Sequence, residues 1–151
     1  MLKTKDNAKF HIVLVLGAIA KNGKILIAQR SFDEVQAAGK WSFPGGKVER
    51  PKDKERNILE NTLRQEIREE VGLEVQKSMK YLVSSSFTRI DNAHVVTLLF
   101  LCRWKSGKAK PLEDSIDVAW ISKKDLKKYD FAEGVEEAIR IAFSAQESKQ
   151  S

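Results

Sequence analysis

The first forty residues of this chain carry two apolar runs that predict a pair of β-strands. One run covers about residues 10–20 and the other about 24–30. Between them, Asn22-Gly23 favours a tight hairpin turn, because both residue types accept a positive φ. A loop over about 31–40 follows and leads to Trp41.

The second half of the chain predicts two longer strands, at about 78–89 and 93–104, joined by a turn at Asp91-Asn92. The run from Val95 to Cys102 is almost entirely apolar, which is typical of a strand covered on both faces. A shorter strand is expected at about 118–121.

One helix is expected before Gly72, because Leu63, Ile67 and Val71 recur at helical spacing and would form a buried stripe. Gly72 suits the position just past its end, and Asp53 is a candidate cap for its start.

Two more helices are expected near the C-terminus. Ser122 with Asp125 resembles a capping box that opens a short helix. A last helix runs from about Glu133 to Ala145, with an apolar face at helical spacing: Val135, Ala138, Ile139, Ala142 and Phe143. The polar tail from Gln146 to Ser151 is expected to fray. With no repeat or linker, residues 1–151 are expected to form a single domain.

Composition narrows the class of partner. The 151 residues suffice for one hydrophobic core, and 42% apolar and 32% charged residues are ordinary for a soluble globular protein. The net charge of +6 and the pI near 9.4 indicate affinity for polyanions. Lysines are scattered along the chain, as on a surface that serves solubility, so no nucleic-acid groove is expected. A basic protein with an acidic metal site would fit a phosphorylated substrate.

The N-terminus imitates a signal peptide, with lysines before an apolar run. His11 and Gly17 interrupt that run, Asp6 lies in the basic part, and the run is too short to cross a bilayer, so a strand pair is the better interpretation. No membrane association is therefore expected. The single cysteine, Cys102, cannot form an internal disulfide and is expected in the core, which fits a reducing cytoplasm.

Three glutamates carry the candidate chemistry. Glu66, Glu69 and Glu70 are spaced i, i+3 and i+4, so their carboxylates share one helix face. Like charges this close destabilise a helix unless a cation lies among them, and Mg²⁺ or Mn²⁺ prefers such oxygen ligands. A Glu-rich solvated helix is the plain alternative. Upstream, Gly45-Gly46 would let a backbone carbonyl approach a metal or phosphate closely.

The combination of these motifs resembles the Nudix hydrolase family, whose box reads G-x5-E-x7-R-E-U-x-E-E-x-G-U, with U apolar. The resemblance is anchored by about residues 41–73, and the segment from Gln65 to Leu73 fits at eight of nine positions. It implies an α/β/α sandwich around a mixed β-sheet.

Two departures from the box stand out. Gln65 replaces the arginine and Asn57 the first glutamate, and Gly46 lies 19 residues before Gln65 where the family has 14. Gln65 can hydrogen-bond but carries no charge. Three acidic residues remain open as substitutes for the missing glutamate: Asp53, Glu55 and Glu60. Activity is expected to be retained, though reduced.

The resemblance also implies a metal site and a general base. Glu66, Glu69 and Glu70 would hold Mg²⁺, with Mn²⁺ as a substitute, and the carbonyl of Gly46 would be a further ligand. In MutT-like members the base lies a few residues ahead of a tryptophan, here Trp120. Three candidates for the base stay open: Asp114 first, then Glu113, and Glu69 of the box itself. A solvated turn is the alternative for the first two.

Substrate contacts follow from the same resemblance. Arg30 would contact phosphate and Glu133 would lie near the nucleobase, while Trp41, Phe43 and Phe87 could stack on a base or belong to the core. A homodimer is expected by analogy alone.

The substrate is expected to be a nucleotide. Thr88 stands where ADP-ribose hydrolases usually have proline, and Ile90 and Asp91 where dinucleoside polyphosphate hydrolases usually have tyrosine. These absences favour a nucleoside triphosphate, split to monophosphate and pyrophosphate. An ADP-ribose or nucleotide-sugar pyrophosphatase is an alternative. A nucleotide-binding regulator with weakened catalysis is another, supported by Gln65 and Asn57.

Overall fold

The computed structural model describes residues 10–49 and 54–148. Its strands, in chain order, are β1 (His11–Lys21), β2 (Lys24–Arg30), β3 (Trp41–Ser42), β4 (Gly45–Lys47), β5 (Glu74–Val75), β6 (Lys80–Thr88), β7 (His94–Ser106) and β8 (Ser115–Ile121). Its helices are α1 (Ile58–Val71), the 3₁₀ helix η2 (Lys123–Lys128) and α2 (Val135–Ser148). No helix in this part of the chain is long and apolar enough to cross a membrane.

The strands form a mixed sheet whose centre is the parallel pair β1 and β7. The register of this pair runs from His11 opposite His94 to Ala20 opposite Arg103. The sheet order is β3-β2-β1-β7-β5, and β4, β6 and β8 pair antiparallel with β1, β7 and β2. A parallel pair needs a long crossover, and α1 lies within the segment that joins β1 and β2 to β7.

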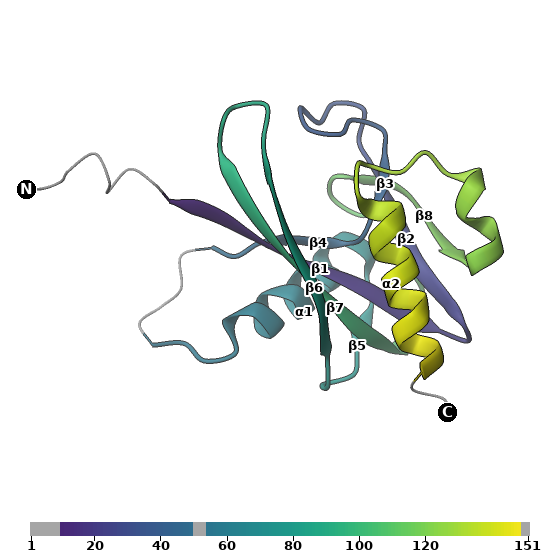
Figure 1. Ribbon diagram of the computed structural model, residues 1–151. Helices are drawn as coiled ribbons and strands as arrows, with labels where there is room; N and C mark the ends of the chain where they lie inside the picture. Colours follow the sequence, from purple (N-terminus) through teal and green to yellow (C-terminus); the bar gives the residue numbers. More distant parts are fainter. Residues whose placement is uncertain (1–9, 50–53, 149–151) are drawn as a thin grey trace, which may run out of the picture.

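The two long helices cover opposite faces of this sheet, as Figure 1 shows for α1 and for α2 in yellow. Successive side chains of a strand point to opposite faces, so β1 serves both layers. Val15 and Ile19 pack with Leu63 and Ile67 of α1. Ala18 packs in the second layer, which contains these α2 residues: Val135, Ile139, Ala142 and Phe143. The expected α/β/α sandwich is confirmed.

Most of the longer elements agree with the sequence. The strand pair with a turn at Asn22 and Gly23 is confirmed, and both turn residues have positive φ, 52° and 79°. Gly72 ends α1 in the left-handed conformation, and the capping box of Ser122 and Asp125 opens η2. The lysines before the first strand and the candidate cap Asp53 lie outside the described residues; Asn57 occupies the N-cap of α1.

Other boundaries were wrong. β3, β4 and β5 were not predicted, because two or three residues carry too little periodicity. β8 begins at Ser115, three residues before the predicted start, because it pairs with β2 from Ile25 to Arg30. The last helix begins at Val135 and continues to Ser148, so the expected frayed tail does not start at Gln146, which is buried.

Candidate active site

The last two turns of α1 carry the three glutamates of the box. Leu63, Ile67 and Val71 are fully buried, and they fix which face of the helix packs against the sheet. Beside this stripe, Glu66 and Glu70 are half-buried and lie against β4, whereas Glu69 is exposed. The helix and its stripe are therefore as predicted.

The glycine pair lies against these carboxylates. β4 pairs with the middle of β1, with Gly45 opposite Leu16 and Gly46 opposite Val15. The Gly45 N–H donates to Glu70 Oε1 at 3.3 Å. A Cβ at Gly46 would overlap the carboxylate of Glu66, and one at Gly45 would overlap the carbonyl oxygen of Val15. Only glycine lets the strand and the carboxylates come this close.

Burial, with the nearby negative charges adding to it, raises the pKa values of two glutamates. Burial is the largest cause for Glu66, the charges of Glu69, Glu113 and Glu49 add to it, and the pKa is about 6. Burial also raises the pKa of Glu70, to about 7, although the hydrogen bond from Gly45 works in the opposite direction. Both carboxyl groups therefore hold a proton more tightly than a solvated glutamate does.

These residues suit a divalent metal ion by their chemistry. All three are carboxylates, and hard ions such as Mg²⁺ and Mn²⁺ take oxygen ligands. The close approach of Glu66 to Gly46 places a carboxylate beside the backbone that would supply the expected carbonyl ligand. Within residues 10–49 and 54–148, however, no three His, Cys, Asp or Glu side chains are already placed to hold a metal ion. The carboxylates would have to draw together around it.

The loop between β7 and β8 is hydrogen-bonded to the end of α1. The N–H groups of Lys110 and Leu112 donate to the carbonyls of Val71 and Glu70, at 3.1 and 3.0 Å. This docking puts Glu113 close enough to Glu66, and Asp114 close enough to Glu70, for their charges to raise those pKa values. The two candidates for the general base in this loop, Glu113 and Asp114, thus lie beside the box, which contains the third candidate, Glu69.

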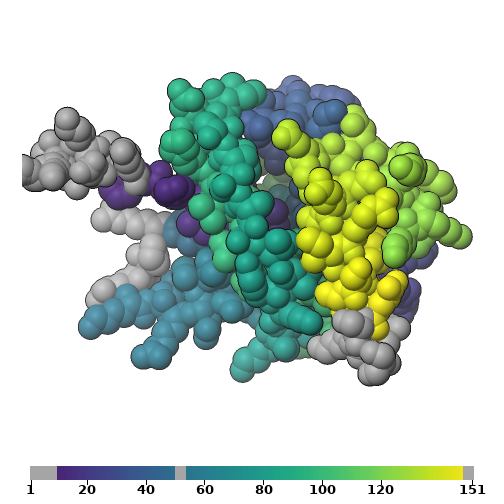
Figure 2. Space-filling model, in the orientation of Figure 1, coloured from purple at the N-terminus to yellow at the C-terminus, as the bar shows by residue number. Residues whose placement is uncertain are grey.

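A cleft of about 510 Å³ opens beside this cluster. Figure 2 shows the surface hollowed between the teal β6–β7 hairpin and yellow α2. Its lining includes six of the predicted site residues, which come from separate parts of the chain: Arg30, Gly46, Glu70, Phe87, Asp114 and Glu133. Phe43 also lines it, with its side chain largely buried. Glu133 lies in the turn two residues before α2 begins.

Four predicted residues do not line the cleft: Trp41, Glu66, Glu69 and Glu113. Glu66 and Glu113 lie in the charged cluster at its end. Trp41 packs edge-on against Tyr129, with ring centroids 5.0 Å apart, so the structure gives this ring a packing contact away from the cleft.

Several polar residues of the cleft were missed from the sequence. They are Gln29, Glu34, Gln36, Ser85, Ser86 and Thr97. Ser85 and Thr97 share a hydrogen bond of 2.8 Å between β6 and β7. Thr97 interrupts the apolar run of β7, and this interruption was the available clue. Glu49, whose charge acts on Glu66, was also missed.

Gln65 and Asn57, the two residues that depart from the box, lie in different environments. Gln65 donates from Nε2 to Glu69 Oε2 at 3.0 Å, so an uncharged amide orients one carboxylate of the box. Asn57 caps α1 in the left-handed conformation, with a φ of 56°, and forms no side-chain capping bond. Among the candidate substitutes for the missing glutamate, Asp53 lies outside the described residues and Glu55 is exposed.

Comparison with known proteins relates this chain to one family. The family model described as NUDIX domain matches residues 10–140. Nucleoside triphosphatase NudI of Escherichia coli is 27% identical over 137 residues, covering 85% of this chain and 94% of NudI.

Solved structures share the fold. The MutT NUDIX hydrolase from Burkholderia pseudomallei is 25% identical, with a TM-score of 0.68, and the match covers 89% of this chain and 97% of that one. The NUDIX domain of Shewanella oneidensis NrtR, crystallised with ADP ribose, is 18% identical, with a TM-score of 0.72 and coverage of 97% and 99%, and shows the fold alone.

Proposed function

This chain belongs to the Nudix hydrolase family, as a MutT-like pyrophosphohydrolase, and we propose that it hydrolyses a nucleoside or deoxynucleoside triphosphate to the monophosphate and pyrophosphate. One observation carries the proposal: Gly46, Glu70, Asp114 and Arg30 line one cleft, large enough for a nucleotide. The likeness to nucleoside triphosphatase NudI over most of both chains supports the choice of a triphosphate.

In the proposed reaction, water attacks a phosphorus of the linkage between the α- and β-phosphates. A new P–O bond forms, the bond to the bridging oxygen breaks, and the water proton moves to Asp114. We favour Asp114 as the base because it lines the cleft, whereas Glu113 and Glu69 do not. Arg30, which lies opposite Ser115 in the pairing of β2 with β8 and so beside Asp114, would neutralise phosphate charge.

Family members generally use divalent metal ions, and we propose Mg²⁺ here, with Mn²⁺ as a substitute. Glu66, Glu69 and Glu70 would hold the ion together with the carbonyl of Gly46. The bound ion would neutralise charge on the phosphate oxygens and lower the pKa of a coordinated water. Gln65 and the Gly45 N–H would orient Glu69 and Glu70 for that task.

Product analysis tests the proposal. Protein with Mg²⁺ would be incubated with nucleoside triphosphates, oxidised triphosphates, ADP-ribose, nucleotide sugars and dinucleoside polyphosphates, beside a Glu69→Gln, Glu70→Gln double variant. We expect a monophosphate and pyrophosphate from at least one triphosphate, and none from the double variant. An Asp114→Asn variant should lose at least about a hundredfold in turnover if Asp114 is the base.

Other results would redirect the assignment. Cleavage of ADP-ribose or a nucleotide sugar alone would make the chain a pyrophosphatase of that class. Nucleotide binding without any turnover would indicate a regulator, as the Gln65 and Asn57 departures suggest. A cytoplasmic location and a homodimer stay predictions, to be checked by fractionation and by light scattering.

A further inference from the structure

Arg30 is held in place by the loop that follows it, residues 31–40. Its Nε donates to the carbonyl oxygen of Gln36 at 2.9 Å, and its Nη2 is paired with Glu34 Oε1 at 2.8 Å. The Arg30 side chain is 36% exposed. The orientation of this arginine therefore depends on where the loop lies.

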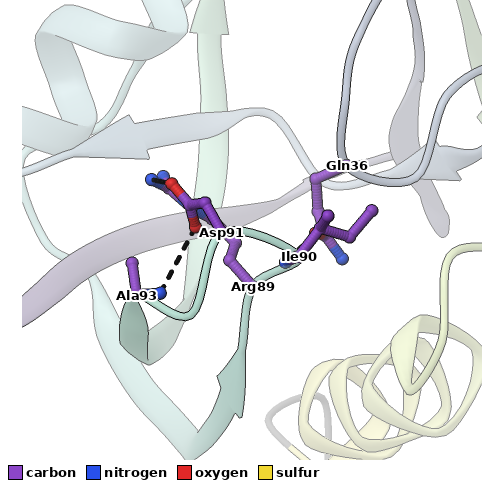
Figure 3. Close-up of polar contacts among 5 residues, drawn as sticks. All are labelled: Gln36, Arg89, Ile90, Asp91 and Ala93. Carbon is purple, nitrogen blue, oxygen red and sulfur yellow. Dashed lines mark hydrogen bonds and ion pairs between the residues drawn. The ribbon is translucent and has the colours of Figure 1, made fainter.

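The same loop is fastened to a distant part of the chain. Gln36 Oε1 accepts a hydrogen bond from the backbone N–H of Ile90, 54 residues away, at 3.2 Å. Ile90 lies at the tip of the β6–β7 hairpin, and Figure 3 shows the side chain of Gln36 reaching toward it. In Figure 1 the tip and the loop stand at the same edge of the molecule.

The hairpin tip is a firm anchor because it is bonded internally. Arg89 pairs with both carboxylate oxygens of Asp91, at 3.0 and 2.6 Å, and Asp91 accepts a bond from the N–H of Ala93 at 3.3 Å. The N–H of Asn92 donates to the carbonyl of Arg89 at 2.9 Å. These contacts fix the direction of the Ile90 N–H.

Gln36 thus joins two walls of the cleft. Arg30, Glu34 and Gln36 line one side, and Phe87 and Thr88, just before the hairpin tip, line another. We propose that Gln36 is a positioning residue whose side chain anchors loop 31–40 to the hairpin while its main-chain carbonyl aims Arg30 at the phosphates of the substrate. The inference rests on the proposed function for the identity of that substrate.

The proposal gives the side chain and the main-chain carbonyl of Gln36 different roles, and a substitution can distinguish them. Replacing its side chain leaves the carbonyl that holds Arg30 but releases the loop from the hairpin. Gln36→Met keeps the length of the side chain and removes the acceptor oxygen. Val35→Ala is the matched control, since Val35 is the preceding residue of the same loop and its side chain is 79% exposed.

Steady-state kinetics on the triphosphate found by product analysis provide the first test. We expect Gln36→Met to raise KM about tenfold with kcat within about twofold, since an interaction made equally in the ground and transition states is weakened. Val35→Ala should match the wild type. In an Arg30→Ala background, Gln36→Met should add almost nothing, because the two residues act in series.

A second readout needs no turnover. In nitrogen-15 spectra, Gln36→Met should shift the resonances of the Ile90 amide and the Arg30 Nε–H, and it should weaken binding of inorganic tripolyphosphate with Mg²⁺ about tenfold. If the wild type hydrolyses no triphosphate, the proposed function fails while this experiment still decides the role of Gln36. The inference is wrong if Gln36→Met equals Val35→Ala, or if its full effect persists without Arg30.

Discussion

Gly45 and Gly46 are neighbours, yet an added methyl group should have opposite effects at the two positions. At Gly46 the methyl would meet the end of Glu66, a flexible side chain that can move aside. We expect Gly46→Ala to change the free energy of unfolding by less than about 1 kcal/mol and to weaken Mn²⁺ binding about tenfold, since a displaced carboxylate is a poorer ligand.

At Gly45 the methyl would meet the backbone of Val15 and Leu16 in the centre of the sheet, which cannot move cheaply. Gly45→Ala should lower the free energy of unfolding by about 2 kcal/mol or more. Urea unfolding and Mn²⁺ titration of both variants provide the comparison. Equal losses of stability would contradict the placement of Glu66 against Gly46.

Gln65 provides a second prediction about a single residue. Its amide donates to Glu69, and Gln65→Leu keeps the approximate shape while removing the donor. We expect turnover to fall about tenfold, the cost of losing one hydrogen bond to a charged group, with little change in stability because the side chain is exposed. Exposed Asn61→Leu on the same helix is the control. Unchanged turnover in Gln65→Leu would mean that Glu69 is oriented by other contacts.

Single residues of the site were predictable where local spacing defined them. That Glu66, Glu69 and Glu70 share one helix face follows from helical periodicity, and Gly72 from the end of the same helix. Glu49 and Gln36 could not be predicted in this way. Their contacts involve a charge on another segment and a backbone N–H 54 residues away, and neither leaves a pattern in the local sequence.

Among the elements, the loop between β7 and β8 has the closest link to the site, because it carries Asp114 to the end of α1. Gly107 begins this loop with a φ of 100°, and a Cβ there would lie 2.8 Å from the carbonyl oxygen of Gly72. Gly107→Ala should therefore lower the free energy of unfolding by about 2 kcal/mol and also reduce turnover, because the docking of the loop on α1 is disturbed.

Gly23→Ala is the control for Gly107→Ala. Gly23 also has a positive φ, 79°, but a methyl group added there would meet no atom within 4 Å, and Gly23 does not line the cleft. We expect a loss of about 1 kcal/mol from backbone strain and unchanged turnover. If the two variants had equal turnover, the loop would not position the base.

Elements were predictable in proportion to their length and periodicity. β1, β2, β6, β7 and both long helices show clear patterns over seven or more residues. β3, β4 and β5 are short pieces defined by the strands beside them, and β8 extends to Ser115 only because β2 offers it partners. Pairing between distant segments, which sequence periodicity does not contain, decided these boundaries.

For the whole molecule, the fold could be predicted from the order of elements and from the resemblance of one motif. The shape of the cleft could not be predicted from either. Arg30, Phe87, Asp114 and Glu133 come together only because β2, β6, β8 and α2 surround the same end of the sheet. The resemblance predicts a role for each of them separately, and those roles stay predictions. The polar wall of Ser85, Ser86 and Thr97 depends on the pairing of β6 with β7 and became apparent only in three dimensions.

The charged cluster should also make the stability of the whole protein depend on pH and metal. Glu66 and Glu70 have pKa values of about 6 and 7 in the folded protein, above the ordinary 4.5. A carboxyl group with a raised folded pKa contributes stability that is complete below about 4.5 and is lost as pH rises through the folded value. In EDTA, the melting temperature should therefore fall between pH 5 and 8.

The size and origin of this fall can be tested directly. In a protein of this size, a loss of about 1 kcal/mol in the free energy of unfolding lowers the melting temperature by about 3 °C. We therefore expect the melting temperature to drop by a few degrees. A Glu66→Gln, Glu70→Gln variant should lose this part of the pH dependence, because neither amide titrates. Mg²⁺ should raise the melting temperature of the wild type most at pH 8, where the carboxylates are charged, and hardly that of the variant. Parallel pH profiles for the two proteins would show that burial and the neighbouring charges do not raise the pKa values of these glutamates.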